Sequence, residues 1–550
     1  MTSAQPTDWV QEAAPARKRS NFAPATTGQA QQRGRRGLGT VARYGLIALL
    51  GGLYLLPFMR VLSGAPDEGI YLYAADRVVH GAIPGRDFVQ ENPPGAYYWL
   101  AWFFRAFGTN LLTARTVLFF TAVATVITIF HLARRAGSSG TYAALFVLIT
   151  SVPLMPINSP HYDSNLFALI AFAFFLRGCE FGDSGKQLYW PFAIAGVLAG
   201  WVSCILQQKG LLFLAAFSIT ALLLHRKRGI RLCMVMAACY ASVILAEIAP
   251  YIVWGALPDL FTSVVKMPLT SYQGLNQVPY GFPIWTVWFP ALYSQFRANA
   301  PVWIALPLLA EVSLPFIFML IAPALVAVLG YLWRPGAFGK KLLPFWIAGY
   351  AMWLSELHRQ DLSHLRNGCL LLAILFFALC ERFGRRAPKR AALALTLGTL
   401  LMGTTSLNGA LHAHQPIFSR RGTLVAHERY PLLDELIACT RPGDYAFVYP
   451  YSPVYYFLAE VRNPTRFSVI VDQHKGNPNM TEAVHDLEAH KPQYVIVDTT
   501  LQGDGMRTMF PAYRAPKPED RVIDIYISSH YHLIRTQDGF ELLERNGQHS

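Results

Sequence analysis

The chain has 550 residues, of which 53% are hydrophobic and only 15% are charged. A soluble protein of this length needs more charged residues to cover its surface. The apolar residues also occur in blocks long enough to cross a bilayer. The composition therefore excludes a disordered, collagen-like or disulfide-stabilised chain and indicates a polytopic membrane protein.

The formal net charge of +14 comes from short basic clusters that lie between the apolar blocks. In a soluble protein such a charge would suggest a nucleic-acid partner. Here the clusters are better explained as the signals that orient helices in a membrane, so we expect no nucleic-acid partner. Residues 1–42 are basic and lack apolar periodicity, which indicates a disordered cytoplasmic tail and not a cleavable signal peptide.

About eleven apolar segments are each predicted to cross the membrane as a helix. Basic clusters follow alternate segments, on the side of the N-terminal tail. An odd number of spans then places the N-terminus in the cytoplasm and the C-terminus outside, in a multi-pass protein of the cell (inner) membrane. The segments are 43–63, 111–132, 140–156, 164–178, 189–206, 210–225, 231–254, 313–333, 342–357, 365–380 and 391–410.

The pattern changes at about residue 411, where the apolar blocks shorten to the length of strands. Strand-like and helix-like stretches alternate, which predicts a small extracytoplasmic α/β domain over 411–550 with a partly parallel sheet. Asp538-Gly539 indicates a hairpin turn between the last two strands. The expected strands are 445–449, 467–471, 493–499, 532–536 and 540–545, and the expected helices are 452–460 and 481–490.

The first outer loop, residues 64–110, opens with an acidic pair. Asp67 and Glu68 follow the first span directly, where a carboxylate must be hydrated, paired or functional because burying its charge is costly. Stretches 69–80 and 95–107 are predicted to form helices that lie along the membrane surface.

Further charged residues are expected at the outer ends of later spans: Asp163, Lys209, Arg359, Asp361 and His364. We expect them to converge with the acidic pair on one extracytoplasmic cavity. Such a cavity suits a lipid-linked anionic donor, because cations bind phosphate and a carboxylate takes the proton of an attacking hydroxyl.

The histidines allow a second interpretation. His358, Asp361 and His364 have i, i+3, i+6 spacing, which on a helix spreads them around its surface. With His412 and His414 they would build a zinc site. Ordinary interfacial histidines explain the pattern as well, so we predict no metal ligand and leave a divalent metal open as the only cofactor.

The order Asp67-Glu68, Arg86-Asp87-Phe88 and Pro93-Pro94 after a first span resembles the first-loop pattern of the GT-C glycosyltransferases. More narrowly it is similar to bacterial relatives of protein O-mannosyltransferases and of the aminoarabinose transferases that act on lipid A. The string Arg359-x-Asp361-x-x-His364 resembles that group too. The resemblance covers about 44–410, so the transmembrane glycosyltransferase domain is expected over 43–410.

The resemblance implies an inverting hexosyl or pentosyl transferase of the cell envelope. Its donor is a sugar on a polyprenyl phosphate, and its acceptor is a hydroxyl of a glycan, a lipid or a protein outside the membrane. In that family Asp67 matches the general base, with Glu68 beside it, and Asp163 matches a substrate or metal contact.

The remaining roles are assigned by position within the resembled site. Lys209 and Arg359 are expected at the donor phosphate, and His364 and Asp361 at the substrate. Asp87 is expected at the substrate, or alternatively it holds its loop through Arg86.

Two other classes of function are alternatives to sugar transfer. A transporter or flippase of lipid-linked sugars is the first alternative, but such proteins often carry inverted repeats and broken helices at mid-membrane, and no such symmetry is visible. A structural protein that presents an outer domain would need one membrane anchor, and not eleven.

Overall fold

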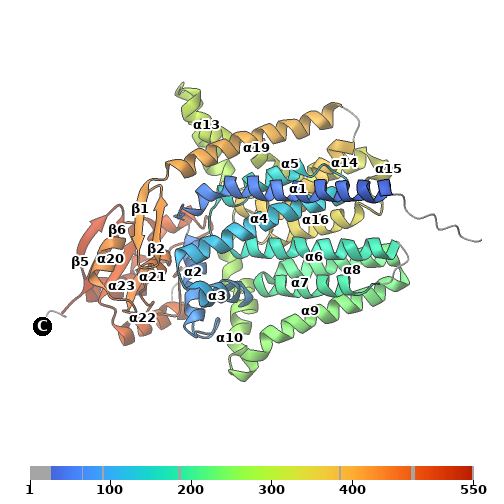
Figure 1. The fold of residues 1–550 in the computed structure, drawn as a ribbon. Coiled ribbons are helices and arrows are strands. Elements are labelled where there is room, and N and C mark those ends of the chain that lie inside the picture. The colour runs from blue at the N-terminus through green and yellow to red at the C-terminus, as the bar shows by residue number, and fades with distance from the viewer. Residues whose placement is uncertain are drawn as a thin grey trace, which may run out of the picture. The chain divides into compact units, whose positions relative to one another are not determined.

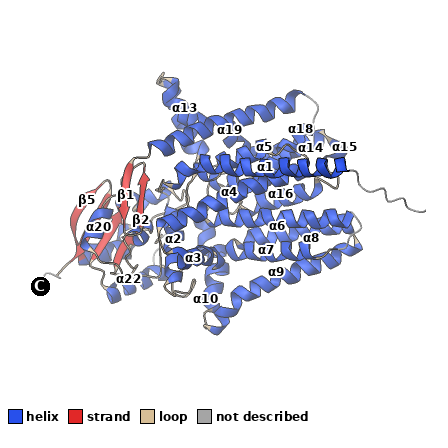
Figure 2. Cartoon of the chain, in the orientation of Figure 1, coloured by secondary structure: helices blue, strands red, loops and turns tan. Residues whose placement is uncertain are grey.

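The computed structural model describes residues 27–64, 66–89, 92–183, 188–382, 386–471 and 477–547. Two compact units, residues 1–47 and 48–550, divide the chain, and helix α1 (Thr27–Met59) belongs partly to each. Within the second unit the protein is mostly helical, with a small sheet region near the C-terminus (Figure 2).

Six helical segments of the described chain are long and apolar enough to cross a membrane, and a seventh results if the bent pair α17–α18 is counted as one. The expected count of about eleven is therefore not confirmed. Every expected span does contain helix, but α5, α7 and α16 have only 10, 16 and 13 residues. The six segments are Val41–Met59 of α1, α4 (Leu111–Ala136), α8 (Gln207–His225), α9 (Lys227–Val253), Val302–Leu332 and α19 (Arg386–His412). The remaining expected spans are occupied by α5 (Thr141–Thr150), η1 (Val152–Leu154), α6 (Pro160–Asp183), α7 (Trp190–Ile205), α16 (Leu343–Ser355), α17 (Leu362–Gly368) and α18 (Leu370–Arg382).

The expected outer loop across 256–312 is largely helical, which corrects the sequence-based prediction. Proline explains why the helices were not recognised: it interrupts the apolar pattern, yet it is favoured in a first helical turn, as in α10 and α12. The segment Val302–Leu332 begins there and runs on into the next span. The elements are α10 (Leu257–Phe261), η2 (Thr262–Lys266), η3 (Pro268–Tyr272), α11 (Gln273–Leu275), η4 (Ile284–Trp288), α12 (Phe289–Arg297), α13 (Val302–Glu311), α14 (Leu314–Leu332) and α15 (Arg334–Ala337).

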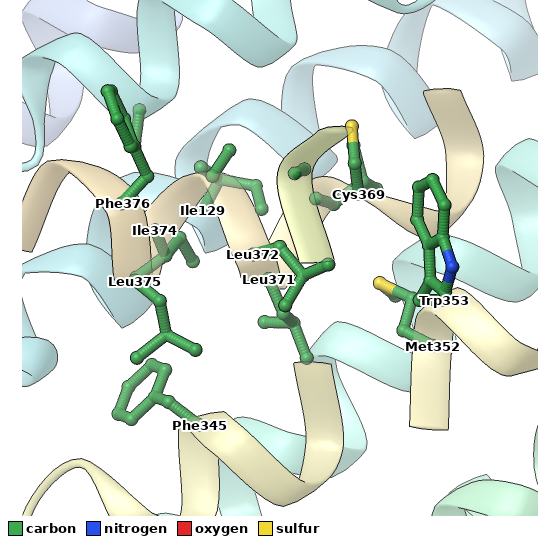
Figure 3. Close-up of a cluster of buried hydrophobic side chains, with 14 of the residues drawn as sticks. Ile129, Phe345, Met352, Trp353, Cys369, Leu371, Leu372, Ile374, Leu375 and Phe376 are labelled. Carbon is green, nitrogen blue, oxygen red and sulfur yellow. The ribbon is translucent and has the colours of Figure 1, made fainter. Parts of the chain in front are cut away.

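Helix α18 lies in the core of the helical region. All of its residues from 370 to 380 are buried, as expected for a helix that is apolar on every face. Figure 3 shows Phe345 of α16 and Ile129 of α4 among the side chains around Leu371, Leu375 and Phe376. The side chains from 370 to 380 are apolar and pack against other apolar side chains in this cluster.

The two helices expected in the first outer loop are present. They are α2 (Pro66–Val79) and α3 (Gly95–Phe107). Trp102 and Phe107 of α3 are exposed, which suits a helix at the membrane surface. Helix α2 is mostly buried instead, because further chain covers it.

The C-terminal region, residues 413–547, carries a hairpin and a four-stranded sheet of order β3-β4-β6-β5. β3 and β4 are parallel and the other pairs are antiparallel, so the expected partly parallel sheet is present. Positive φ at both Asp538 and Gly539 forms the expected tight turn between the last two strands. The strands are β1 (Gln415–Ser419), β2 (Gly422–Ala426), β3 (Ala446–Tyr449), β4 (Tyr494–Asp498), β5 (Tyr531–Gln537) and β6 (Phe540–Arg545). The helices are α20 (Leu433–Cys439), α21 (Val454–Leu458), α22 (Pro478–His490), η5 (Thr499–Leu501), η6 (Gly503–Thr508), η7 (Pro518–Asp520) and α23 (Val522–His530).

The expected strand at 467–471 is not part of this sheet, and the β1–β2 hairpin was not foreseen. Phe467 makes only an isolated bridge, to Val89 of the first outer loop. Side chains compete for its backbone: Asn463 Nδ2 and the Thr465 hydroxyl both donate to the Phe467 carbonyl, at 2.7 and 3.1 Å. Such local bonds replace a strand ladder.

The C-terminal region packs directly on α2, and Figure 1 shows the strands beyond the end of the long helices where α2 lies. Arg421 bonds Asp76 of α2 and Glu460, each at 3.0 Å. A Cβ on Gly69 would come within 2.2 Å of the Val454 nitrogen, so only glycine allows this approach. The position of α2 therefore depends on both the helices and the C-terminal region.

Candidate functional site

Asp67 lies in the first turn of α2 with its side chain exposed to solvent. The surrounding protein desolvates the carboxylate and raises its pKa, although Arg359, His364 and His161 act in the opposite direction. This combination is expected for a carboxylate in a concave site that a substrate can still reach. A raised pKa makes it a stronger base than an ordinary aspartate.

Three elements bring a histidine–glutamate group near Asp67. His161 lies in the first turn of α6, Glu356 directly follows α16 and His364 lies in α17, and each offers one ligand atom within 4.8 Å of the others. His161 Nδ1 lies 3.0 Å from Glu356 Oε2, and the rings of His161 and His364 are 4.7 Å apart in an edge-to-face arrangement.

Asp361 caps the N-terminus of α17. Its Oδ1 accepts from the His364 backbone N–H at 3.0 Å and lies 2.7 Å from His364 Nδ1, while Arg359 Nε donates to Oδ2 at 2.5 Å. Burial raises the pKa of Asp361, but His364 and Arg359 outweigh burial and leave the pKa below its usual range. The carboxylate therefore stays charged and orients both neighbours.

His358, Asp361 and His364 do not follow helical spacing, which corrects the sequence-based prediction. The physical reason is that helix α17 begins only at Leu362, so His358 and Asp361 precede it. The rings of His358 and His364 lie 4.9 Å apart. His412 and His414 are exposed at the end of α19 and are not members of the histidine–glutamate group.

Glu68 points away from this site into a buried ion pair. It is fully buried, and both of its oxygens accept from the Arg115 guanidinium of α4. The Asn158 N–H also donates to it, at 3.1 Å. Glu68, expected from the sequence to act beside Asp67, instead joins α2 to α4. The pKa of Asp67 is raised mainly by burial and not by Glu68.

Lys209, expected at the donor phosphate, is also buried in an ion pair. Its ammonium lies 2.7 Å from Glu356 Oε1 and donates to Ser164 Oγ at 3.0 Å and Asn165 Oδ1 at 2.6 Å. Oxygens of three residues thus surround the ammonium. Glu356 was missed, although it is the only charged residue in 342–357, and a lone carboxylate at the end of a span is a recognisable signal.

The other expected substrate residues already have protein partners. Asp163 is buried and accepts from Tyr71 of α2 at 3.0 Å and Thr121 of α4 at 3.2 Å. Asp87 accepts from Arg86 at 2.7 and 2.9 Å and from the Ile83 N–H at 2.8 Å, as the loop-holding alternative describes.

Arg359 faces the site but has several contacts besides Asp361. It donates to Asn276 Oδ1 at 2.5 Å and to the Met509 carbonyl at 2.8 Å, and its guanidinium lies over the Phe510 ring. The segment between α16 and α17 is thereby joined to the C-terminal region. Arg359 remains the cation with the largest electrostatic effect on Asp67.

A cavity of about 840 Å³ lies beside the start of α2 and is lined by Pro66, the neighbour of Asp67. Its helical wall includes Phe58, Leu154 and Ala410, from the ends of α1, η1 and α19, and Pro307 from the middle of α13. Its other wall belongs to the C-terminal region and contributes all the charged residues among the described lining. The polar residues include His427, Glu428, Arg429, Asp498 and Thr500.

No protein-family model matches this chain, and no curated protein matches it at a significant level. Among solved structures it is similar to the oligosaccharyltransferase of Archaeoglobus fulgidus, at 12% identity and a TM-score of 0.53. The match covers 92% of this chain and 75% of that one. The fold is that of the GT-C glycosyltransferases.

Further structures of the archaeal enzyme match equally well. One, in complex with an inhibitory peptide and a dolichol phosphate, has a TM-score of 0.52 at 11% identity, over 92% of this chain and 75% of that one. Another, in complex with zinc and sulfate, has a TM-score of 0.50 at 12% identity, over 88% and 71%. ArnT from Cupriavidus metallidurans bound to undecaprenyl phosphate matches at 13% identity and a TM-score of 0.40, over 93% and 98%.

Proposed function

We propose that this protein is an inverting glycosyltransferase that moves a sugar from a polyprenyl-phosphate donor to an acceptor hydroxyl. Asp67 carries the proposal: it is a reachable carboxylate with a raised pKa at the start of a helix beside a large cavity. As general base it would take the acceptor proton while the hydroxyl attacks the sugar. The archaeal enzyme with this fold binds dolichol phosphate, which supports a lipid-linked donor.

The division of labour within the chain is part of the proposal. Residues 43–410 would bind the donor and hold the base, and 411–550 would close the cavity and help to bind the acceptor. Asp361, His364 and Arg359 would orient groups around Asp67, whereas Glu68, Asp87, Asp163 and Lys209 would act through structure alone.

A transfer assay in proteoliposomes tests the function. Purified protein with a labelled polyprenyl-phosphate sugar should release free polyprenyl phosphate as label reaches an acceptor in the lumen or the medium. If label instead becomes protected inside vesicles while still attached to the lipid, the protein is a flippase, and transfer is excluded.

We infer that the N-terminus is cytoplasmic and that α2, the site and the C-terminal region face the outer compartment. Arg135, His225, Lys340 and Lys341 come from three separate parts of the chain yet line one pocket of about 290 Å³. Gathered basic residues favour the cytoplasmic side. Reporter fusions after Ala410 should be active outside and fusions near Lys227 inside. The opposite pattern would place the site in the wrong compartment.

We further propose that His161, Glu356 and His364 hold a divalent ion. Two imidazoles and one carboxylate suit zinc, and Asp67 and Asp361 lie close by. Such an ion would supply positive charge at the donor phosphate. The archaeal enzyme with this fold has been solved with zinc and sulfate.

Metal content tests this site without an activity assay. The full-length protein should bind about one zinc ion per chain and His364→Ala should lose it, and zinc should raise the thermal midpoint of the wild type and of the control variant but not that of His364→Ala. His412→Ala, which removes an exposed histidine outside the group, is the matched control. Equal metal content in all three proteins would contradict the assignment.

A further inference from the structure

One wall of the cavity beside Asp67 comes from the helices and is mostly apolar, and the wall from the C-terminal region, here called the polar wall, carries all the charged residues among the described lining. Three of the membrane-length segments contribute to its apolar wall through Phe58, Pro307 and Ala410. The ends of spans lie at the level of lipid headgroups. A ligand with an apolar chain in the bilayer would therefore present its headgroup to the polar wall.

Most cations around the site are already neutralised. Arg115, Lys209, Arg359 and Arg421 each pair with a carboxylate, those of Glu68, Glu356, Asp361 and Asp76 respectively. Engaging a phosphate would require each of them to give up a partner that is mostly buried. Lys209, which the sequence suggested as the phosphate ligand, is therefore unsuited to bind a phosphate.

Arg429 differs from all of these. It lies in the segment between β2 and α20, lines the cavity and is exposed. Within the part of the chain that the structure describes, its guanidinium makes no hydrogen bond, ion pair or ring contact. Among the described residues that line the cavity it is also the single arginine or lysine.

We propose that Arg429 is a phosphate-binding residue of the lipid-linked donor, held at the polar wall of the cavity while the polyprenyl chain lies along Phe58, Leu154 and Pro307. This inference rests on the proposed function and deepens it. A guanidinium suits the task because its planar donors match two phosphate oxygens at once. It would serve both the donor phosphodiester and the phosphate that leaves.

The lining of the cavity sets the selectivity of the site. Glu428 and Asp498 line it too, so a free anion gains one guanidinium but also meets two carboxyl groups. The polyprenyl chain adds contacts with the apolar wall that inorganic phosphate lacks. We therefore expect inorganic phosphate to bind weakly and the lipid chain to be needed for affinity.

Binding of a polyprenyl phosphate to the full-length protein in nanodiscs tests the assignment, with polyprenol and inorganic phosphate as comparison ligands. Arg429→Ala should weaken polyprenyl phosphate binding roughly 10- to 100-fold, the usual worth of a hydrogen bond to a charged group. It should leave polyprenol binding unchanged, and Arg429→Lys should retain part of the affinity. Arg441→Ala, an exposed arginine of the same region outside the cavity, is the control.

If Arg429→Ala binds polyprenyl phosphate as tightly as the wild type, the proposal is overturned. An equal loss of polyprenol binding would overturn it too, because it would show that the substitution deforms the cavity. Binding that depends on Arg429 in a protein without transfer activity would keep the site and remove the transferase function. If Arg429→Ala still transfers sugar with an unchanged KM for the donor, the transferase function stands but Arg429 is not the phosphate-binding residue.

Discussion

Replacing Asp67 by asparagine is expected to lower turnover by roughly 10²–10⁴-fold, the usual contribution of a general base. The amide keeps the size of the side chain and its hydrogen bonding but takes no proton. Donor affinity should remain, because Arg429 and not Asp67 is the proposed phosphate contact. Single-turnover rates and donor affinity, measured on the same preparation, separate the two effects.

The pH dependence of the wild type follows from the raised pKa of Asp67. The base works only when deprotonated, so activity is lost as pH falls through this pKa. The loss should therefore begin at a higher pH than an ordinary aspartate, with a pKa of about 4, would give. Asp67→Asn should abolish this limb of the profile.

Stability provides a control for the same variant. A carboxyl group whose pKa is raised on folding favours the folded state at low pH and opposes it as pH rises through the folded pKa. Removing the charge should leave the thermal midpoint at neutral pH unchanged or higher. A lower midpoint with a parallel loss of activity would mean that Asp67 is structural, and near wild-type turnover would place the base elsewhere.

The adjacent substitution is expected to act in the opposite way. Glu68→Gln removes one partner of a fully buried ion pair and leaves the Arg115 guanidinium charged in the interior. Breaking such a pair typically costs about 3–5 kcal/mol of unfolding free energy. The protein should unfold at a markedly lower temperature in detergent, and the fraction that remains folded should still turn over.

A double variant distinguishes this mechanism from a catalytic one. Glu68→Leu with Arg115→Met removes both charges and keeps apolar volume, so it should recover much of the lost stability. If Glu68→Gln instead loses turnover at full stability, Glu68 belongs to the catalytic machinery after all.

The sequence by itself determined the membrane class, the helices of the first outer loop and the mixed sheet near the C-terminus. These depend on local properties: apolar block length, amphipathic spacing and turn residues such as Asp538-Gly539. The sequence also pointed to Asp67 as a candidate. A carboxylate directly after a membrane span is unusual, and this can be seen without knowing which helices are neighbours.

Only the tertiary structure decided how the charged residues are shared among partners. Lys209 and Glu356 are far apart in the sequence, and so are Glu68 and Arg115. The sequence shows that each charge is present, but the partner that neutralises it depends on which helices are neighbours. For that reason Glu68, expected to be catalytic, and Lys209, expected at the donor phosphate, are buried in ion pairs. Arg429, unremarkable in the sequence, is the arginine that faces the cavity among the described residues.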